Sequence, residues 1–142
     1  MDSRLSFVTL VVRNITDSRR FYVDGLGWQP ELAAPEVLMF RVAERVVLSL
    51  WDFDAATAEL GTAPSMGGVP PVTLAHNLRT KEGVDRVLES ARTLGAQVWE
   101  AQERDWGGYS GYFADPDGYR WEICVNSGEI GQSVLPGAGE PD

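Results

Sequence analysis

The sequence has little of what metal and thiol chemistry needs, with one cysteine and one histidine in 142 residues. Because Cys124 is the only cysteine, an intrachain disulfide and a multi-thiolate zinc site within one chain are excluded. We expect Cys124 to be a small buried side chain on a strand. A catalytic thiolate needs a nearby base, and the only histidine, His76, is far away in the sequence.

Basic residues and long apolar runs are also scarce. Twelve Lys and Arg residues against 21 Asp and Glu residues give a formal net charge of −9, and no basic cluster reverses it. Attraction to nucleic acid or to anionic lipid is therefore not expected. No stretch approaches the roughly 20 apolar residues of a membrane span, and the N-terminus does not look like a signal peptide. We expect a cytoplasmic protein with no nucleic-acid or membrane partner.

What is present is a globular composition that is 44% hydrophobic and 23% charged, arranged as two similar halves. In the first half, a strand at 6–12 is followed by a helix that Thr16 or Asp17 can cap and that the glycines of 24–28 end. Further strands are predicted at 36–43 and 45–53, with a possible short one at 29–32.

The second half repeats this pattern after a short helix at 54–60 and a Gly/Pro-rich connector at 61–71. A strand at 71–78 leads to a helix that begins at Thr80 and stops at Gly95. The remaining strands are predicted at 96–101, 109–115 and 120–125, and the sequence Asp-Pro-Asp-Gly at 115–118 favours a type I turn between the last two.

The fold predicted from this pattern is α+β, with an internal duplication of two β-α-β-β-β modules. The modules are 6–53 and 71–126, joined by the connector within a single domain at 1–126. The tail at 127–142 is rich in Gly, Pro and acidic residues, and we expect it to be partly mobile.

Two segments carry a family resemblance: "DSRRFYVDGLGW" at 17–28 and "GYFADPDGYRWEI" at 111–123. In these positions they resemble the vicinal oxygen chelate superfamily of glyoxalase I, bleomycin-resistance proteins, fosfomycin-resistance enzymes and extradiol dioxygenases. The resemblance covers about residues 6–126. It implies a curved, mostly antiparallel, U-shaped sheet around a ligand cavity, and a homodimer. In metal-dependent members, His, Gln, Glu or Tyr side chains on the first and last strands of the modules hold a divalent ion.

Carried onto this chain, the four ligand positions of the family fall on Phe7, Ser49, Thr73 and Glu122. Phenylalanine cannot coordinate a metal, and the neutral hydroxyls of Ser49 and Thr73 are weak partners for a divalent ion. Three of the four positions therefore lack a good ligand, and one carboxylate cannot hold a catalytic ion by itself. We expect no metal cofactor. The alternative is a divalent ion held by ligands exchanged between chains.

A second register is open in the strand at 71–78. Counting back from the following helix selects His76 in place of Thr73, and matching the two "VTL" copies selects Pro71. Residues 73 and 76 lie on opposite faces of a strand, so only one of them can face the ligand. We favour Thr73 because the turn "RTKEG" is longer than usual for the family. The fallback metal pair is His76 with Glu122. Otherwise His76 is a hydrogen-bonded histidine between sheet and helix.

Without a metal, Glu122 still needs a partner, because an unpaired buried carboxylate is costly. It can accept a hydrogen bond from a ligand amine or hydroxyl, or act as a general base. A local hydroxyl, Arg120 or Arg45 can equally hold it. The other predicted ligand-binding residues lie on or beside the cavity strands, and several are aromatic: Phe7, Thr9, Ser49, Trp51, Thr73, Trp106, Tyr109 and Tyr112. By alternation, Trp121 and Phe113 belong to the core.

The function favoured by these residues is that of a metal-free protein that binds a small aromatic or cationic organic molecule, of the antibiotic-sequestering type. The alternative is a lyase, isomerase or dioxygenase of the same superfamily, either metal-dependent or using Glu122 as a general base. A third hypothesis is an accessory domain with a vestigial cavity. The sequence does not decide between a binding protein and an enzyme.

Overall fold

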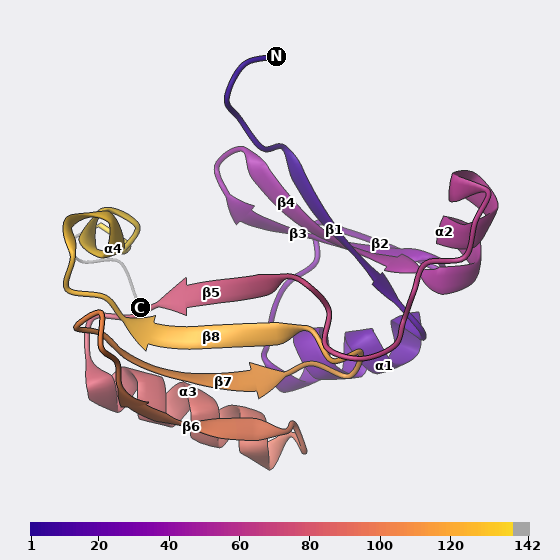
Figure 1. Cartoon of the computed structure of the whole chain (residues 1–142). Coiled ribbons are helices and arrows are strands. Elements are labelled where there is room, and N and C mark those ends of the chain that lie inside the picture. The colour runs from indigo at the N-terminus through magenta and orange to yellow at the C-terminus, as the bar shows by residue number, and fades with distance from the viewer. Residues whose placement is uncertain (138–142) are drawn as a thin grey trace. The chain divides into compact units, whose positions relative to one another are not determined.

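Each half of the chain folds into a four-stranded sheet with a helix against one face (Figure 1). The structure is a computed structural model that describes residues 1–137. It separates into two compact units, Met1–Gly67 and the residues from Gly68 onward. Both sheets contain one parallel and two antiparallel strand pairs. The predicted α+β class and the internal duplication are confirmed.

Unit 1 has the strand order β1-β4-β3-β2, with β1 parallel to β4. Its strands are β1 (Phe7–Val12), β2 (Leu32–Ala34), β3 (Val37–Ala43) and β4 (Val46–Asp52). Helix α1 (Ile15–Arg19) continues directly into a π-helical segment, η1 (Arg20–Gly25), and α2 (Phe53–Leu60) follows β4. The possible short strand therefore lies a few residues later than predicted.

The first helix begins earlier than predicted, because Asn14 caps it. The Asn14 side chain accepts hydrogen bonds from the backbone N–H groups of Thr16, at 2.8 Å, and Asp17, at 3.4 Å. The prediction of Thr16 or Asp17 as the cap was wrong, since both already lie inside the helix. Asn14 has an extended backbone, so its amide oxygen reaches the first free N–H groups as soon as the strand ends.

The core of unit 1 lies between the helix and one face of the sheet. Leu10 and Val12 of β1 are buried, as alternation along the strand predicts. Tyr22 of η1 is fully buried, with its ring centroid 6.0 Å from that of Phe40 on β3. Leu38, Leu48 and Leu50 complete this apolar layer. The opposite face of the sheet is thereby left for other roles.

Unit 2 has the matching order β5-β8-β7-β6, with β5 parallel to β8. Its elements are β5 (Thr73–Asn77), α3 (Lys81–Thr93), β6 (Val98–Glu103), β7 (Tyr109–Ala114), β8 (Arg120–Val125) and α4 (Glu129–Ser133). Helix α4 falls in the tail, where no helix was predicted. The mobility of the tail stays a prediction, and its last residues, 138–142, lie outside the described part of the chain.

The boundaries of α3 agree with the sequence signals. Thr80 is the N-cap, and its hydroxyl accepts a hydrogen bond from the Gly83 N–H at 3.1 Å. Gly95 follows the helix with a φ of 83°, a conformation that favours glycine. Leu88 on the inner face of α3 packs onto Gly111 of β7, where an added Cβ would lie 2.6 Å from Leu88 Cδ1. The helix therefore rests directly on backbone at this point.

The turn at 115–118 fixes the entry into β8. The Gly118 N–H donates to the Asp115 carbonyl at 3.0 Å, and the Asp115 carboxylate accepts from the backbone N–H groups of Asp117 and Tyr119. Gly118 has a φ of 89°, which releases the chain into the strand. The predicted turn is confirmed, and it sets the register that positions Glu122.

Candidate functional site

In unit 2, the sheet face away from α3 carries most of the polar side chains singled out by the sequence. Strand pairing assigns the face, because residues directly opposite one another on neighbouring strands point to the same side. We call this side the Glu122 face. It contains Thr73, Ala75, Asn77, Ser110, Tyr112, Ala114, Arg120, Glu122 and Cys124.

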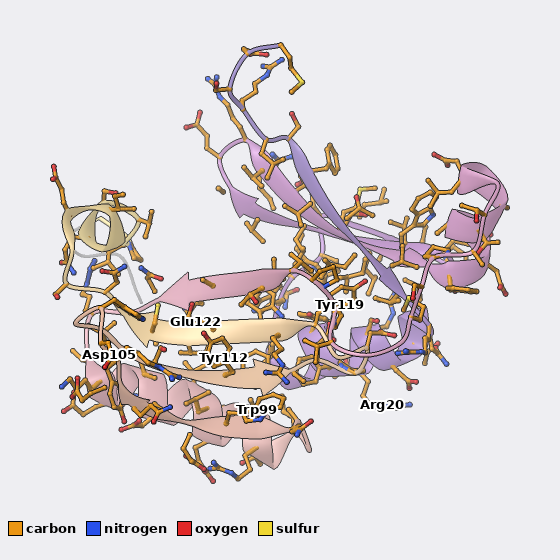
Figure 2. The ribbon with its side chains drawn as sticks, in the orientation of Figure 1. Arg20, Trp99, Asp105, Tyr112, Tyr119 and Glu122 are labelled. Atoms are coloured by element: carbon orange, nitrogen blue, oxygen red, sulfur yellow. The ribbon has the colours of Figure 1, made fainter. Side chains whose placement is uncertain are left out.

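A row of four residues crosses the Glu122 face from edge to edge: Trp99, Tyr112, Glu122 and Ala75 are successive partners on β6, β7, β8 and β5. Figure 2 shows Trp99, Tyr112 and Glu122 on these strands. The Tyr112 hydroxyl donates a hydrogen bond to Glu122 Oε1 at 2.9 Å. Glu122 is half-buried and satisfied by a hydroxyl of its own sheet.

The environment of Tyr112 keeps its phenol protonated. Burial, and then the hydrogen bond to the Glu122 carboxylate, raise the pKa of Tyr112 above its ordinary value. A tyrosine with a raised pKa is neutral throughout the physiological range, so it remains a donor to Glu122. The Tyr112 hydroxyl therefore stays bonded to Oε1, one of the two carboxylate oxygens of Glu122.

Two arginines on this face lie over aromatic rings: Arg104 over Tyr112, and Arg120 over Trp99. Arg104, in the turn between β6 and β7, donates to Ser110 Oγ at 2.9 Å and to the Ser110 carbonyl at 3.0 Å. Its guanidinium lies 5.8 Å from the centroid of the Tyr112 ring. The Arg120 guanidinium lies 4.0 Å from the centroid of the Trp99 ring, within the range of a cation–π contact.

Cys124 is buried on the same face, as predicted, and its thiol donates to Asn77 Oδ1 at 3.0 Å. Burial, with a smaller contribution from the Glu122 charge, raises the pKa of the Cys124 thiol to about 11. The thiol is therefore protonated at neutral pH. A nucleophilic role does not suit it, because the thiolate is the reactive form.

The structure separates the remaining predicted residues of unit 2. Thr73 lies on the Glu122 face, opposite Arg120, whereas His76 is opposite Ile123 and so lies on the other face. Tyr109 also lies on the other face, and its hydroxyl donates to Asp85 Oδ1 of α3 at 2.8 Å. Trp106 is half exposed in the turn between β6 and β7, with its ring against Gly108. Of these residues, only Thr73 shares the face of Glu122 by strand pairing.

Unit 1 has an equivalent face, which we call the Ser49 face. The matching row is Leu32, Met39, Ser49 and Thr9 on β2, β3, β4 and β1. Phe7 and Trp51 lie on the same side of the sheet as Ser49. Phe7 pairs with Val47, as Thr73 pairs with Arg120, so Phe7 and Thr73 occupy corresponding places in the duplicated fold.

The donor set does not fit the divalent ion that the family resemblance implies. The neighbours of Glu122 across the sheet are Ala75 and Tyr112, and the tyrosine has a raised pKa. His76 points away from Glu122 within the same sheet, so the fallback pair cannot chelate one ion inside unit 2. Within residues 1–137, no three His, Cys, Asp or Glu side chains gather as a metal site would require.

Sequence reasoning underrated three residues of this face, namely Trp99, Arg104 and Arg120. Arg120 was considered only as a rim partner of Glu122. Yet it lies two positions before Glu122 on one strand, and that spacing alone places both on one face. Trp99 and Arg104 carried no comparable signal, because a bulge in β6 shifts the register between Trp99 and Gln102.

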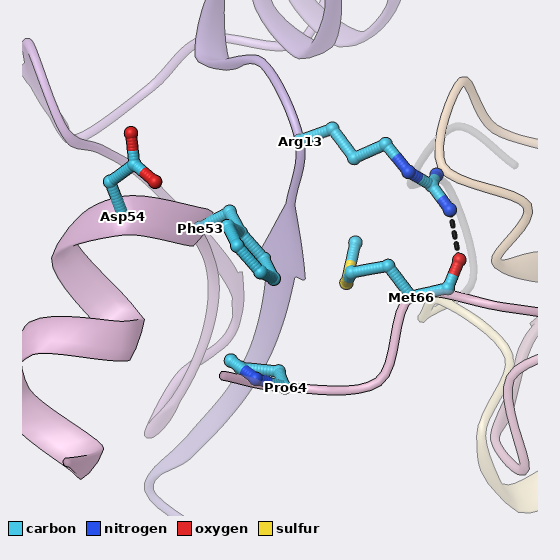
Figure 3. A pocket seen from close by; sticks show the side chains of 5 residues that line it. All are labelled: Arg13, Phe53, Asp54, Pro64 and Met66. Carbon is cyan, nitrogen blue, oxygen red and sulfur yellow. Dashed lines mark hydrogen bonds between the residues drawn. The ribbon is translucent and has the colours of Figure 1, made fainter. Parts of the chain in front are cut away.

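A separate hollow of about 460 Å³ lies in unit 1, lined by Arg13, Phe53, Asp54, Pro64 and Met66. In Figure 3 the Arg13 guanidinium donates to the Met66 carbonyl across its rim. None of the predicted ligand-binding residues lines this hollow.

The sequence model of the Glyoxalase/Bleomycin resistance protein/Dioxygenase superfamily matches residues 4–123 of the chain. The chain belongs to this superfamily. Its structure is similar to that of a glyoxalase-related enzyme from Fulvimarina pelagi, with 32% identity, a TM-score of 0.80, and coverage of 87% of this chain and 88% of that one.

Two more distant superfamily structures have the same fold. A lactoylglutathione lyase from Agrobacterium tumefaciens is 23% identical, with a TM-score of 0.67 and coverage of 89% and 96% of the two chains. A fosfomycin resistance protein from Listeria monocytogenes is 22% identical, with a TM-score of 0.68 and the same coverage. The comparison with curated proteins found no match.

The comparisons thus establish the superfamily and leave the reaction, the ligand and the assembly open. The homodimer and the cytoplasmic location stay predictions. Within the described residues, no helix is both long enough and apolar enough to cross a membrane.

Proposed function

We propose that the protein binds a small organic molecule on the Glu122 face, and that it does so without a metal ion. The observation that carries this proposal is the row Trp99, Tyr112, Glu122 and Ala75, in which a carboxylate held by a tyrosine is flanked by flat aromatic surface. Such a row offers hydrogen bonding and stacking to an organic ligand. It offers a metal ion only one good ligand.

Glu122 is the residue expected to select the ligand. The Tyr112 hydroxyl donates to Oε1, so a ligand hydroxyl or amine is expected to donate to the remaining acceptor sites of the Glu122 carboxylate. Ala75, the opposite neighbour, has a small side chain that leaves room beside the carboxylate. Binding proteins and enzymes of the superfamily both fit this arrangement. Among residues 1–137, no His, Cys, Asp or Glu cluster adds a second metal ligand to Glu122, which favours the metal-free binding protein.

Thermal unfolding with a panel of natural-product antibiotics, thiol adducts and catechols tests this proposal. A ligand at about 100 times its dissociation constant should stabilise the fold by about 2.7 kcal/mol. The effect should be lost in Glu122→Gln and kept in Glu103→Gln, which removes an exposed carboxylate of the same sheet that pairs with Lys81. Stabilisation that survives Glu122→Gln would place the ligand elsewhere.

Elemental analysis of the purified protein, before and after dialysis against Ni²⁺, Zn²⁺, Fe²⁺ and Mn²⁺, tests the metal-free part. We expect no stoichiometric ion in either sample. An ion retained by the wild type and lost in Glu122→Gln would overturn this part of the proposal and favour a metal-dependent enzyme.

A further inference from the structure

Two opposite charges lie on the Glu122 face without neutralising one another. Arg120 and Glu122 are two positions apart on β8, which places their Cα atoms about 6.6 Å apart along the strand. Within residues 1–137, the Arg120 side chain makes no ion pair or hydrogen bond, and its guanidinium lies over the Trp99 ring. Glu122 is bonded to Tyr112 instead. Each charge has an aromatic partner that holds it away from the other.

The path of the Arg120 side chain explains how this separation is kept. Arg120 starts on β8 and reaches Trp99 on β6, so its side chain crosses the intervening strand β7. The residue opposite Arg120 on β7 is Ala114, whose small side chain leaves that crossing open. A guanidinium over an aromatic ring keeps its five N–H donors for other partners, because a cation–π contact uses none of them.

The surroundings of Arg120 suit an anion. Thr73, on the other side of Arg120 in the sheet, is exposed and adds a hydroxyl to the same face. Arg104 adds a second guanidinium beyond Tyr112. Charges at this range outweigh the distant negative charge of the whole chain, because the Debye length at physiological salt is about 8 Å. The net charge of −9 is therefore a poor guide to the ligand.

We propose that Arg120, stacked on Trp99, is an anion-binding subsite, and that the ligand is a small planar molecule with a carboxylate or similar anion at one end and a hydroxyl or amine at the other. The anion bonds to Arg120 and the donor to Glu122. This inference rests on the proposed function, which it deepens by naming the chemical class of the ligand. It replaces the expected cationic ligand with an anionic one.

Three probes of one shape test the charge preference: 4-hydroxyphenylacetate, its neutral amide and the cationic amine tyramine. Binding is followed by the ¹⁵N-labelled indole signal of Trp99, assigned with Trp99→Phe. We expect the carboxylate to bind at least about tenfold more tightly than the amide, equivalent to about 1.4 kcal/mol, and tyramine to bind most weakly. Equal or tighter binding of the amide or of tyramine would overturn the inference, as would no shift with the carboxylate.

Arg120→Gln tests the residue itself. It should lower the affinity for the carboxylate to that of the amide while leaving the amide unchanged. Arg45→Gln, which removes an exposed arginine of unit 1, is the matched control and should change neither. An unchanged carboxylate preference in Arg120→Gln would refute the subsite alone, whereas failure of the whole ligand panel to stabilise the wild type would refute the proposed function.

Discussion

The Ser49 face and the Glu122 face have the same strand pairing but different side chains at corresponding positions. Position by position, Leu32, Met39, Ser49 and Thr9 in unit 1 correspond to Trp99, Tyr112, Glu122 and Ala75 in unit 2. The first row has no charge, and the second has a carboxylate with a built-in hydrogen-bond donor. Strand pairing has been preserved between the halves, while the side chains on this face have not.

This difference shows that the fold constrains the two faces of each sheet unequally. The faces that pack on the helices are apolar in both units, because burial there stabilises the fold. The faces away from the helices have diverged. The Ser49 face carries Arg41, which pairs with Glu31, beside Phe7, whereas the Glu122 face has a carboxylate bonded to a tyrosine. Exchanging residues between corresponding positions therefore tests which differences matter.

The largest effect is expected at Gly111, whose counterpart in unit 1 is the fully buried Leu38. Gly111→Leu should lower the free energy of unfolding by about 3 kcal/mol or more, because an added Cβ would lie 2.8 Å from the backbone nitrogen of Ala101 and the carbonyl oxygen of Trp99. Urea unfolding measures this loss. Gly67→Ala, where an added Cβ meets nothing within 4 Å, should be close to neutral.

A smaller effect is expected when the carboxylate of unit 2 is placed in unit 1. Ser49 is 3% exposed and has Met39 where Glu122 has Tyr112. Ser49→Glu should be less stable than the equally large Ser49→Gln by about 2 kcal/mol at neutral pH, because the buried charge lacks the tyrosine hydroxyl that Glu122 has. Desolvation raises the pKa of the new carboxyl in the folded state, so the difference should vanish in acid, grow as the pH rises from the ordinary carboxyl pKa to the raised one, and then level off.

The double variant Met39→Tyr with Ser49→Glu completes the exchange. The tyrosine should recover part of the loss, as measured by a double-mutant cycle in urea. A cycle with no coupling would show that the donor geometry of unit 2 cannot be transplanted, and that the two faces differ in more than side-chain identity.

The smallest effect is expected at Tyr112. Tyr112→Phe removes the donor to Glu122 and should lower the free energy of unfolding by about 1 kcal/mol. Tyr109→Phe removes a hydroxyl that bonds Asp85 at the exposed surface of the other face, and it should cost less. Thermal or urea unfolding of the two variants ranks them, and the reverse order would mean that Glu122 finds a second donor.

The sequence predicted the fold well because periodicity and turn chemistry are local. Alternation placed Leu10 and Val12 in the core, and Asp115 to Gly118 formed the turn that their residue types favour. The helix cap was misplaced because Asn14, Thr16 and Asp17 are all good capping residues. The choice among them depends on where the strand ends, and the sequence pattern fixes that only to within a few residues.

The site was harder to predict, because its partnerships are made across strands. Glu122 and Tyr112 were both singled out, but their hydrogen bond depends on the register of β7 against β8. The stack of Arg120 on Trp99 spans two strands and a bulge, which no local pattern encodes. Tyr109 was grouped with Tyr112 because both lie on or beside the cavity strands, although three positions along a strand reverse the face.

The turn before β8 also affects how readily isoaspartate forms in the chain. An aspartate followed by glycine, as at Asp117 and Gly118, can rearrange to isoaspartate when the glycine nitrogen attacks the aspartate carboxyl. Here that nitrogen is held by the Asp115 carbonyl, and Asp117 is buried. The rearrangement therefore requires the turn to open first, so the chemical lifetime of the chain at this bond is set by local unfolding of the segment that positions Glu122.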